Sequence, residues 1–280
     1  MTVPTACVIG WPIEHSRSPL IHGYWLKQYG IDGTYTKEAV RPEEVAGFLR
    51  SLAAQGFVGC NVTVPHKEAA YALADVRDAS ARAVQAANTL WVEDGKLHAA
   101  NTDTYGYMTY LDHKVPDWKA HDGPVCVLGA GGAARAIIHG FLEAGSDEVR
   151  VFNRTPSRAE QLAEEFGPRV KVFDWANRSD GAREACVLVN TTSAGLKGAG
   201  TLGMDFGGFN EDCVVSDIVY VPLETELLAQ ARAHGLRTVD GLGMLLHQAV
   251  PGFEKWFGVR PQVTDKLREI VIADIEGRTC

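Results

Sequence analysis

Residues 125–138, VCVLGAGGAARAII, combine a short apolar strand, a glycine-rich turn and the beginning of a helix. Within them Gly129, Gly131 and Ala134 match the spacing G-x-G-x-x-A. The first glycine permits a tight turn, the second lets the backbone approach a pyrophosphate, and the alanine lets the helix pack closely on the strand. The pyrophosphate then meets the positive end of the helix. The segment predicts a dinucleotide site; a glycine turn without a ligand and a methyl-donor nucleotide site are the alternatives.

The next strand ends in VFNRTPSR, at residues 151–158. A site that prefers NAD carries Asp or Glu at this point, to bond the ribose 2′-hydroxyl. This segment has no acid and contains Arg154 and Arg158, whose guanidinium groups match phosphate oxygens. The segment therefore predicts NADP rather than NAD as the cofactor. The alternative is a basic helix start that only faces solvent.

Composition narrows the classes of protein further. The chain has 280 residues, 46% apolar and 22% charged, with a net charge of −8, which disfavours a nucleic-acid-binding surface. No apolar stretch reaches the roughly 18–20 residues that cross a bilayer, and the N-terminal segment lacks a signal-peptide pattern. The cysteines are too far apart for zinc spacing, so we expect no metal, free thiols and a cytoplasmic protein. They are Cys7, Cys60, Cys126, Cys186, Cys213 and Cys280.

Short apolar runs alternate with helical patterns along the chain. This rhythm predicts an α/β fold with largely parallel sheets, divided into two domains. The first is an α/β substrate-binding and catalytic domain over residues 1–112, completed by C-terminal helices at 243–280. The second, over residues 113–242, is a Rossmann-like NADP-binding domain.

Three helix starts are expected in the first domain. Ser18 reads as an N-cap followed by a proline in the first turn, and a second helix is expected over residues 42–56. A third helix is expected to open at Pro65, directly after a strand that alternates polar and apolar residues. That arrangement places Lys67 in the first helical turn, where the helix dipole disfavours a positive charge. A solvated lysine and a proton-transfer group are both open interpretations of Lys67.

The segment NTLWVEDGKLHAANTD contains Asp94-Gly95, the sequence of a two-residue hairpin turn of the I′ type. The paired positions then have numbers that sum to 189, beginning with Glu93 and Lys96. The hairpin is expected to join two polar clusters at one end, with Asp103 either a site residue or a helix N-cap. These clusters are Asn88 with Thr89, and Asn101 with Thr102 and Asp103.

The segment EHSRSP offers two hydroxyl groups, Ser16 and Ser18. In an extended segment, residues two apart point to the same face, so both hydroxyls can meet one carboxylate or polyol. The alternatives are a helix N-cap for Ser18 and an ordinary loop residue for Ser16.

Nine ordered motifs carry a family resemblance that spans residues 9 to about 249. They are GWPIEHSRSPLIH, GCNVTVPHK, AANTL, NTD, VLGAGGAARA, NRTPSR, NTTSAG, DIVYVPLET and DGLGMLLHQA. The set resembles the shikimate dehydrogenase family, whose NADP-dependent members reversibly reduce 3-dehydroshikimate to shikimate in chorismate and aromatic amino acid biosynthesis. The resemblance implies an oxidoreductase of that kind.

The same resemblance implies roles for individual residues. Lys67 and Asp103 are implied to be the catalytic pair. Substrate binding is implied for Ser16, Ser18, Thr63, Asn88, Asp103, Tyr220 and Gln248. The pyrophosphate is implied to meet Gly129, Ala130, Gly131, Gly132 and Ala133. The adenosine 2′-phosphate is implied to meet Asn153, Arg154, Thr155 and Arg158, and the nicotinamide to lie near Ile218 and Gly241.

Some positions depart from the family pattern, and some alternatives stay open. Gln85 and Thr104 stand where glycine is common, and Ala79 stands where many relatives carry an acid. His15 and His66 flank the expected site and are rival bases. A quinate/shikimate dehydrogenase of broader specificity and a non-catalytic NADP sensor are the alternative functions, and a homodimer is an open possibility for the assembly.

Overall fold

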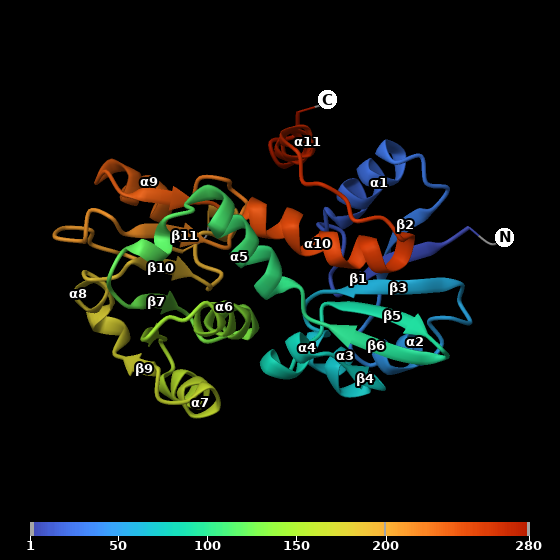
Figure 1. Ribbon diagram of the computed structural model, residues 1–280, viewed down its shortest axis with the longest axis horizontal. Coiled ribbons are helices and arrows are strands. Elements are labelled where there is room, and N and C mark those ends of the chain that lie inside the picture. The colour runs from blue at the N-terminus through green and yellow to red at the C-terminus, as the bar shows by residue number, and fades with distance from the viewer. Residues whose placement is uncertain (1–2, 199, 279–280) are drawn as a thin grey trace. The chain divides into compact units, whose positions relative to one another are not determined.

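The computed structural model describes residues 3–198 and 200–278. The chain divides into two compact units, each with one six-stranded sheet (Figure 1). The first unit comprises residues 1–104 and 246–280, and the second comprises residues 105–245. The α/β class and the Rossmann-like unit expected from the sequence are confirmed, whereas the functional domain boundaries stay a prediction.

The sheet of the first unit has the strand order β2-β1-β3-β5-β6-β4. Its strands are β1 (Thr5–Gly10), β2 (Thr34–Ala39), β3 (Phe57–Val62), β4 (Val76–Arg77), β5 (Thr89–Glu93) and β6 (Lys96–Ala100). β1 pairs in parallel with β2 and β3, and β4 pairs in parallel with β6, whereas β5 is antiparallel to both of its neighbours. The sheet is therefore mixed, with the parallel strands in the majority of the pairings.

Helices cover both faces of this sheet (Figure 1). They are α1 (Ser18–Gln28), α2 (Val45–Arg50), α3 (Lys67–Leu73), α4 (Ala79–Val84) and α11 (Asp265–Ile275), with the part of α10 (Leu242–Phe257) that belongs to this unit. On one face Trp256 of α10 donates its indole N–H to the Leu90 carbonyl over 2.9 Å. A Cβ at Gly59 would lie 2.1 Å from the Trp256 indole nitrogen, so only glycine admits this packing.

The predicted hairpin is confirmed. Asp94 and Gly95 have φ angles of 52° and 72°, as a type I′ turn requires, and Glu93 pairs with Lys96. The ladder continues to Thr89 opposite Ala100. The polar residues that flank both strands are thereby brought to one end of the hairpin.

Three predicted helix boundaries are wrong. Ser18 is the first residue of α1, and Arg17 is its N-cap residue, without a capping side-chain bond. The helix expected over residues 42–56 is reduced to α2, because turns occupy both of its ends. The third helix, α3, begins at Lys67 and not at Pro65, because residues 63–66 form a turn closed by the His66 N–H on the Thr63 carbonyl.

The sheet of the second unit is entirely parallel, in the order β12-β11-β10-β7-β8-β9. Its strands are β7 (Val125–Leu128), β8 (Val149–Phe152), β9 (Val170–Phe173), β10 (Val187–Asn190), β11 (Val214–Asp217) and β12 (Arg237–Val239). This is the doubly wound order of dinucleotide-binding sheets. The helices are α5 (Asp103–Lys114), which begins in the first unit, α6 (Gly132–Glu143), α7 (Pro156–Phe166), α8 (Arg178–Gly181) and α9 (Glu226–Ala233), with short helices η1 (Trp118–Ala120), η2 (Trp175–Asn177) and η3 (Leu196–Gly198).

The strands of this second sheet are buried on both faces. In β7, Val125 and Val127 belong to the core under α5, α6 and α7, whereas Cys126 and Leu128 belong to the core under α8 and α9. A strand with two apolar faces needs a continuous apolar run, which is why VCVL contains no polar residue. The carboxyl ends of the strands are then the free edge on which a ligand site can be built.

Free, buried thiols are found for Cys7, Cys60, Cys126, Cys186 and Cys213, as expected, and Cys280 lies outside the described residues. Within the described parts of the chain, none of the helices is long and apolar enough to cross a bilayer. Cytoplasmic location stays a prediction.

Candidate active site and dinucleotide site

Lys67 and Asp103 form an ion pair in the first unit, with 2.5 Å between Nζ and Oδ2. Lys67 begins α3, and Asp103 begins α5 directly after β6. The lysine side chain is 29% exposed and the aspartate side chain 10% exposed. The carboxylate is thus largely enclosed, whereas the lysine side chain is partly open to solvent. The sequence associated these two residues only through the family resemblance.

Asn88 holds the second oxygen of the carboxylate. Its Nδ2 donates to Asp103 Oδ1 over 2.8 Å and lies 3.4 Å from Gln248 Oε1. Asn88 directly precedes β5, so the hairpin brings it to Asp103 as the pairing rule predicted. Asp103 is the first residue of α5, so it does not stand at the N-cap position, and its N–H is accepted by the Asn101 side chain. Its carboxylate stays directed at Lys67 and Asn88.

The predicted hydroxyl groups follow the ends of β1 and β3, which are neighbours in the sheet. Ser16 Oγ accepts the Ser18 N–H over 3.3 Å, which links the two serines. Arg17, between them, pairs with Asp274 of α11 at 2.9 Å. Thr63 follows β3, and its methyl group covers Gly10 so closely that an added Cβ there would lie 2.6 Å away. Thr63 therefore lies at the same end of the sheet as Asn88, and the two serines belong to the segment that follows β1.

The two rival bases are placed differently. His66 is buried, and its Nε2 lies 2.7 Å from the Val40 carbonyl, which occupies one ring nitrogen and favours a structural role. His15 is exposed in the loop before Ser16. Gln85, which stands where glycine is common in the family, adopts φ = 51° at the C-cap of α4. The local backbone is thus the left-handed one that glycine adopts most easily.

The glycine turn lies between β7 and α6. Gly129 has φ = 109°, and a Cβ there would lie 2.8 Å from Thr191 Oγ1 and 2.9 Å from Thr192 Cγ2. Gly131 is the N-cap of α6 and offers no side-chain bond to the first turn, and Gly132 has open space where a Cβ would stand. The backbone N–H groups of this turn are therefore accessible to an anion, as a pyrophosphate requires.

The remaining members of the predicted turn fit this arrangement. Ala130 and Ala133 are partly buried around the exposed Gly131 and Gly132. Ala134 is fully buried against the sheet, as the close packing of helix and strand demands. Binding of a pyrophosphate at this turn stays a prediction.

Two exposed arginines follow β8. Asn153 Nδ2 donates to the Thr155 carbonyl over 2.8 Å, and Thr155 is the N-cap of α7 without a capping side-chain bond. Among the residues that the structure describes, neither Arg154 nor Arg158 has an ion-pair partner. Nearby Arg135, in contrast, is engaged through both terminal nitrogens by Glu165. Both arginines predicted to meet the 2′-phosphate are thus exposed and without an ion-pair partner in the described part of the chain.

Ile218 and Gly241, which were predicted to lie near the nicotinamide, are neighbours in the second unit. A Cβ at Gly241 would lie 2.3 Å from the Ile218 carbonyl oxygen, so the backbone approach itself requires glycine. Tyr220 follows in the same unit, beyond β11, and is partly buried. Its role at the substrate carboxylate stays a prediction.

Several polar residues in or next to these strands were not assigned a role from the sequence. Asp217, at the end of β11, accepts from Asn190 Nδ2 over 2.9 Å and from Thr225 Oγ1 over 2.7 Å. Burial raises its pKa to about 6, against the effect of these donors. The signal was the single acid in the mainly apolar segment CVVSDIVY. In the first unit Tyr35, Asn61 and Thr89 were likewise not assigned a role.

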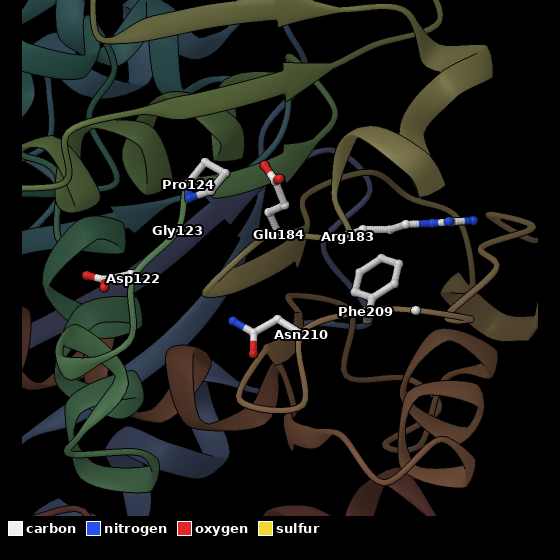
Figure 2. A pocket seen from close by; sticks show the side chains of 8 residues that line it. Asp122, Gly123, Pro124, Arg183, Glu184, Phe209 and Asn210 are labelled. Atoms are coloured by element: carbon white, nitrogen blue, oxygen red, sulfur yellow. The ribbon is translucent and has the colours of Figure 1, made fainter.

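A surface hollow of the second unit lies elsewhere. Figure 2 shows it beside Pro124, Glu184 and Asn210, which precede β7, β10 and β11. It therefore lies at the amino ends of the strands, whereas the glycine turn follows the carboxyl end of β7. The hollow is not the predicted dinucleotide site. Within the described ranges, no group of three or more His, Cys, Asp or Glu side chains could hold a metal ion.

The second unit thus has the strand order and the glycine turn of the Rossmann class of dinucleotide-binding proteins. Family models match the chain in three segments. The shikimate dehydrogenase substrate binding domain matches residues 8–90, the shikimate / quinate 5-dehydrogenase matches 111–197, and the shikimate 5′-dehydrogenase C-terminal domain matches 241–270. The chain belongs to the shikimate dehydrogenase family.

Individual relatives agree with this assignment. The chain is 54% identical over 271 residues to the shikimate dehydrogenase (NADP(+)) of Azorhizobium caulinodans, covering 97% of this chain and 96% of the relative. It is similar to the crystal structure of shikimate 5-dehydrogenase from Thermus thermophilus in complex with NADP(H) and shikimate, with 36% identity, a TM-score of 0.84, and 96% and 98% of the two chains covered. It is also similar to quinate dehydrogenase from Corynebacterium glutamicum in complex with NAD, with 29% identity, a TM-score of 0.88, and 97% and 99% covered.

Proposed function

We propose that this protein is an NADP-dependent shikimate dehydrogenase that interconverts 3-dehydroshikimate and shikimate. The observation that carries the proposal is the enclosed pair of Lys67 and Asp103, with Asn88 on the second carboxylate oxygen. A dehydrogenase of this kind needs one fixed group that exchanges a proton with the substrate oxygen. The NADP-dependent relatives that are 54% identical over nearly the full length support the choice of reaction.

The residues of the first unit divide the work. In the reducing direction Lys67 gives a proton to the substrate oxygen while the carbonyl carbon gains a hydride. Asp103 stabilises the ammonium form before transfer and orients the amine. Asn88, Gln248 and Thr63 bond the ring hydroxyls, and the paired hydroxyls of the EHSRSP segment bond the carboxylate.

The cofactor contacts follow from the second unit. NADPH, when bound, supplies the hydride. The glycine turn at residues 129–133 meets the pyrophosphate through backbone N–H groups, and Arg154 and Arg158 meet the 2′-phosphate, with Asn153 and Thr155 shaping the backbone between them. Ile218 and Gly241 offer a close-packed backbone surface to the nicotinamide.

Quinate differs from shikimate by addition of water across the ring double bond, which places a hydroxyl on the carbon that bears the carboxylate. The resemblance to a quinate dehydrogenase that binds NAD makes this the substrate to compare. The absence of an acid after β8, together with two uncommitted arginines, favours NADP and the shikimate reaction.

One assay tests the proposal: the purified full chain is given shikimate or quinate, each with NADP or NAD, and cofactor reduction is followed. We expect the highest kcat/KM with shikimate and NADP. Higher kcat/KM with quinate would assign the broader or quinate-specific activity. Tight NADP binding without turnover of either substrate would assign the non-catalytic sensor. Cytoplasmic location and a homodimer stay predictions of the sequence.

A further inference from the structure

We propose that Tyr35 and Thr89 are positioning residues for Asp103, acting through a directed chain of hydrogen bonds across the first unit. The inference rests on the proposed function, because it assigns to Asp103 a part in proton transfer. The side-chain bonds of Tyr35 and Thr89 lead to the amides of Asn61 and Asn88 rather than to Lys67. Both residues are argued to act through Asn88.

Four hydrogen bonds make up this series, and in each of them one side chain donates to the next. Tyr35 Oη donates to Asn61 Oδ1 over 2.6 Å, and Asn61 Nδ2 donates to Thr89 Oγ1 over 3.3 Å. Thr89 Oγ1 donates to Asn88 Oδ1 over 3.0 Å. Asn88 Nδ2 donates to Asp103 Oδ1 over 2.8 Å. The last acceptor is the carboxylate that holds Lys67.

Two backbone groups fix this direction. Asn61 Nδ2 also lies 3.1 Å from the Asn88 carbonyl, which can only accept, so the Asn61 amide oxygen must face Tyr35. Asn88 Oδ1 accepts the Thr102 N–H over 2.8 Å, and an N–H can only donate. The amide nitrogen of Asn88 is therefore turned to Asp103, and neither amide can flip without losing a buried bond.

Packing holds Tyr35 in place at the first donor position of this series of hydrogen bonds. Its ring stacks on His22 with 4.0 Å between centroids and 8° between planes. Burial lowers the pKa of His22 to about 3, so the imidazole is neutral at the pH of catalysis. Burial also raises the pKa of Tyr35 well above its usual value, so the phenol keeps its proton and remains a donor.

The sheet makes this contact possible. Tyr35 on β2 and Asn61 on β3 lie on either side of β1, and on β1 they face Ala6 and Val8 in the register. Residues two apart share a face, so both side chains stand on the same face of the sheet. The small side chain of Ala6 leaves the phenol free to reach across β1.

A chain of aligned donors strengthens each bond by polarisation, and it does so most in a buried site. Asn61, Asn88 and Thr89 are all buried. Loss of the phenol or of the threonine hydroxyl leaves the next group with an unmet bond, while the Thr102 N–H still holds the orientation of Asn88. Without the aligned donors behind it, the Asn88 amide is less polarised and bonds Asp103 Oδ1 more weakly. The Asp103 carboxylate is then held less firmly beside Lys67, so kcat falls while shikimate binding changes less.

The test uses the full chain with Tyr35→Phe, Thr89→Val and both together. We expect each single variant to lower kcat roughly ten-fold, the effect of one lost buried bond, with KM for shikimate changed less than kcat. The double variant should lose little more than the more impaired single variant, because both act through one chain. Thr89→Ser, which keeps the hydroxyl, should restore most of kcat.

Matched controls remove the same groups outside the chain. Tyr24→Phe removes another phenol of this unit, and Thr36→Val removes an exposed threonine hydroxyl of β2. Both should keep wild-type kcat, and thermal unfolding should show that all variants fold. Three results would each overturn the inference. The first is a wild-type kcat in both Tyr35→Phe and Thr89→Val. The others are losses that add in the double variant, and a Thr89→Ser variant as impaired as Thr89→Val. Absence of shikimate turnover in the wild type overturns the proposed function itself, which separates the two failures.

Discussion

Each unit buries an aspartate at a polar edge of its sheet, and the two carboxylates have different partners. Asp103 in the first unit faces the Lys67 ammonium and the Asn88 amide. Among the described residues, the donors to Asp217 in the second unit are all neutral: the Asn190 amide, the Thr225 hydroxyl and a backbone N–H. The Lys67 ammonium favours the ionised form of Asp103, whereas burial disfavours the ionised form of Asp217, which links Asn190, Val219 and Thr225.

The cations of the two units also differ in whether they have an ion-pair partner. Lys67 is committed to a protein carboxylate, and Arg154 and Arg158 have no ion-pair partner among the described residues. A proton-transfer group must be fixed before the substrate arrives. A cation that recognises the phosphate of a cofactor must instead stay uncommitted until the phosphate arrives. In the first unit the proposed catalytic side chains are hydrogen-bonded to one another. In the second unit the proposed cofactor site consists of backbone N–H groups of the glycine turn and two arginines without ion-pair partners in the part of the chain that the structure describes.

The largest effect is expected from Lys67→Ala. Loss of a general acid–base group lowers rates by about 10²–10⁴, so kcat should fall by that factor while KM for shikimate changes little. Steady-state kinetics with NADP measures both constants. Lys96→Ala, an exposed lysine of the hairpin, is the matched control and should behave as the wild type. An unchanged kcat in Lys67→Ala would remove the lysine from the reaction.

Asp217→Asn sharpens the contrast between the carboxylates through pH. The folded pKa of about 6 lies above the usual 3.8, so the protonated form is favoured by folding. This contribution is complete below pH 3.8 and is lost as pH rises through 6. Relative to the variant, the wild-type free energy of unfolding should fall by about 3 kcal/mol between about pH 3 and pH 7.

Denaturant unfolding of both proteins over this pH range measures the difference. Asp122→Asn, at an exposed aspartate of the same unit, is the control and should run parallel to the wild type. If the curves of the wild type and Asp217→Asn are parallel as well, Asp217 is ionised without cost and the comparison fails.

Replacing both arginines, Arg154→Gln with Arg158→Gln, tests the uncommitted cations. Charge-assisted bonds to phosphate are worth about 1.5–3 kcal/mol, so NADP affinity should fall by roughly ten- to a hundred-fold. NAD lacks the 2′-phosphate and should bind as before, which lowers the NADP/NAD preference. Lys171→Gln, at an exposed lysine of neighbouring β9, should leave the ratio unchanged. An unchanged ratio in the double variant would contradict the NADP assignment.

Gly129→Ala should have the smallest effect. Its Cβ would meet Thr191 and Thr192 below 3.0 Å and would also strain a backbone with positive φ. We expect roughly a ten-fold weaker NADP affinity, corresponding to about 1–3 kcal/mol of strain at the turn. Gly145→Ala, also at positive φ but with open space around it, isolates the steric part by comparison. Equal NADP affinity in both variants would argue against the close approach at Gly129.

Local patterns in the sequence carried much of the prediction. The strand, glycine turn and helix at residues 125–138 are specified by neighbours in the chain, and so are Asp94 and Gly95 of the hairpin turn. The pairing rule of that turn correctly joined Asn88 to Asp103, because register in a two-residue hairpin follows from the turn alone. Helix starts were less reliable: the cap expected at Ser18 and the start expected at Pro65 were both displaced by adjoining turns.

The sequence by itself therefore determined the α/β class, the glycine turn, the two arginines after β8 and the strand pairing of the hairpin. Each of these features depends on residues close together in the chain. Only the tertiary structure decided that Lys67 meets Asp103 and that Tyr35 reaches Asn61 across an intervening strand. The physical reason is that strand order in a sheet does not follow the order of the chain. Contacts between strands that are adjacent in the sheet but not consecutive in the sequence arise from the packing of the whole unit. Such contacts leave no periodic signal in the sequence of either strand.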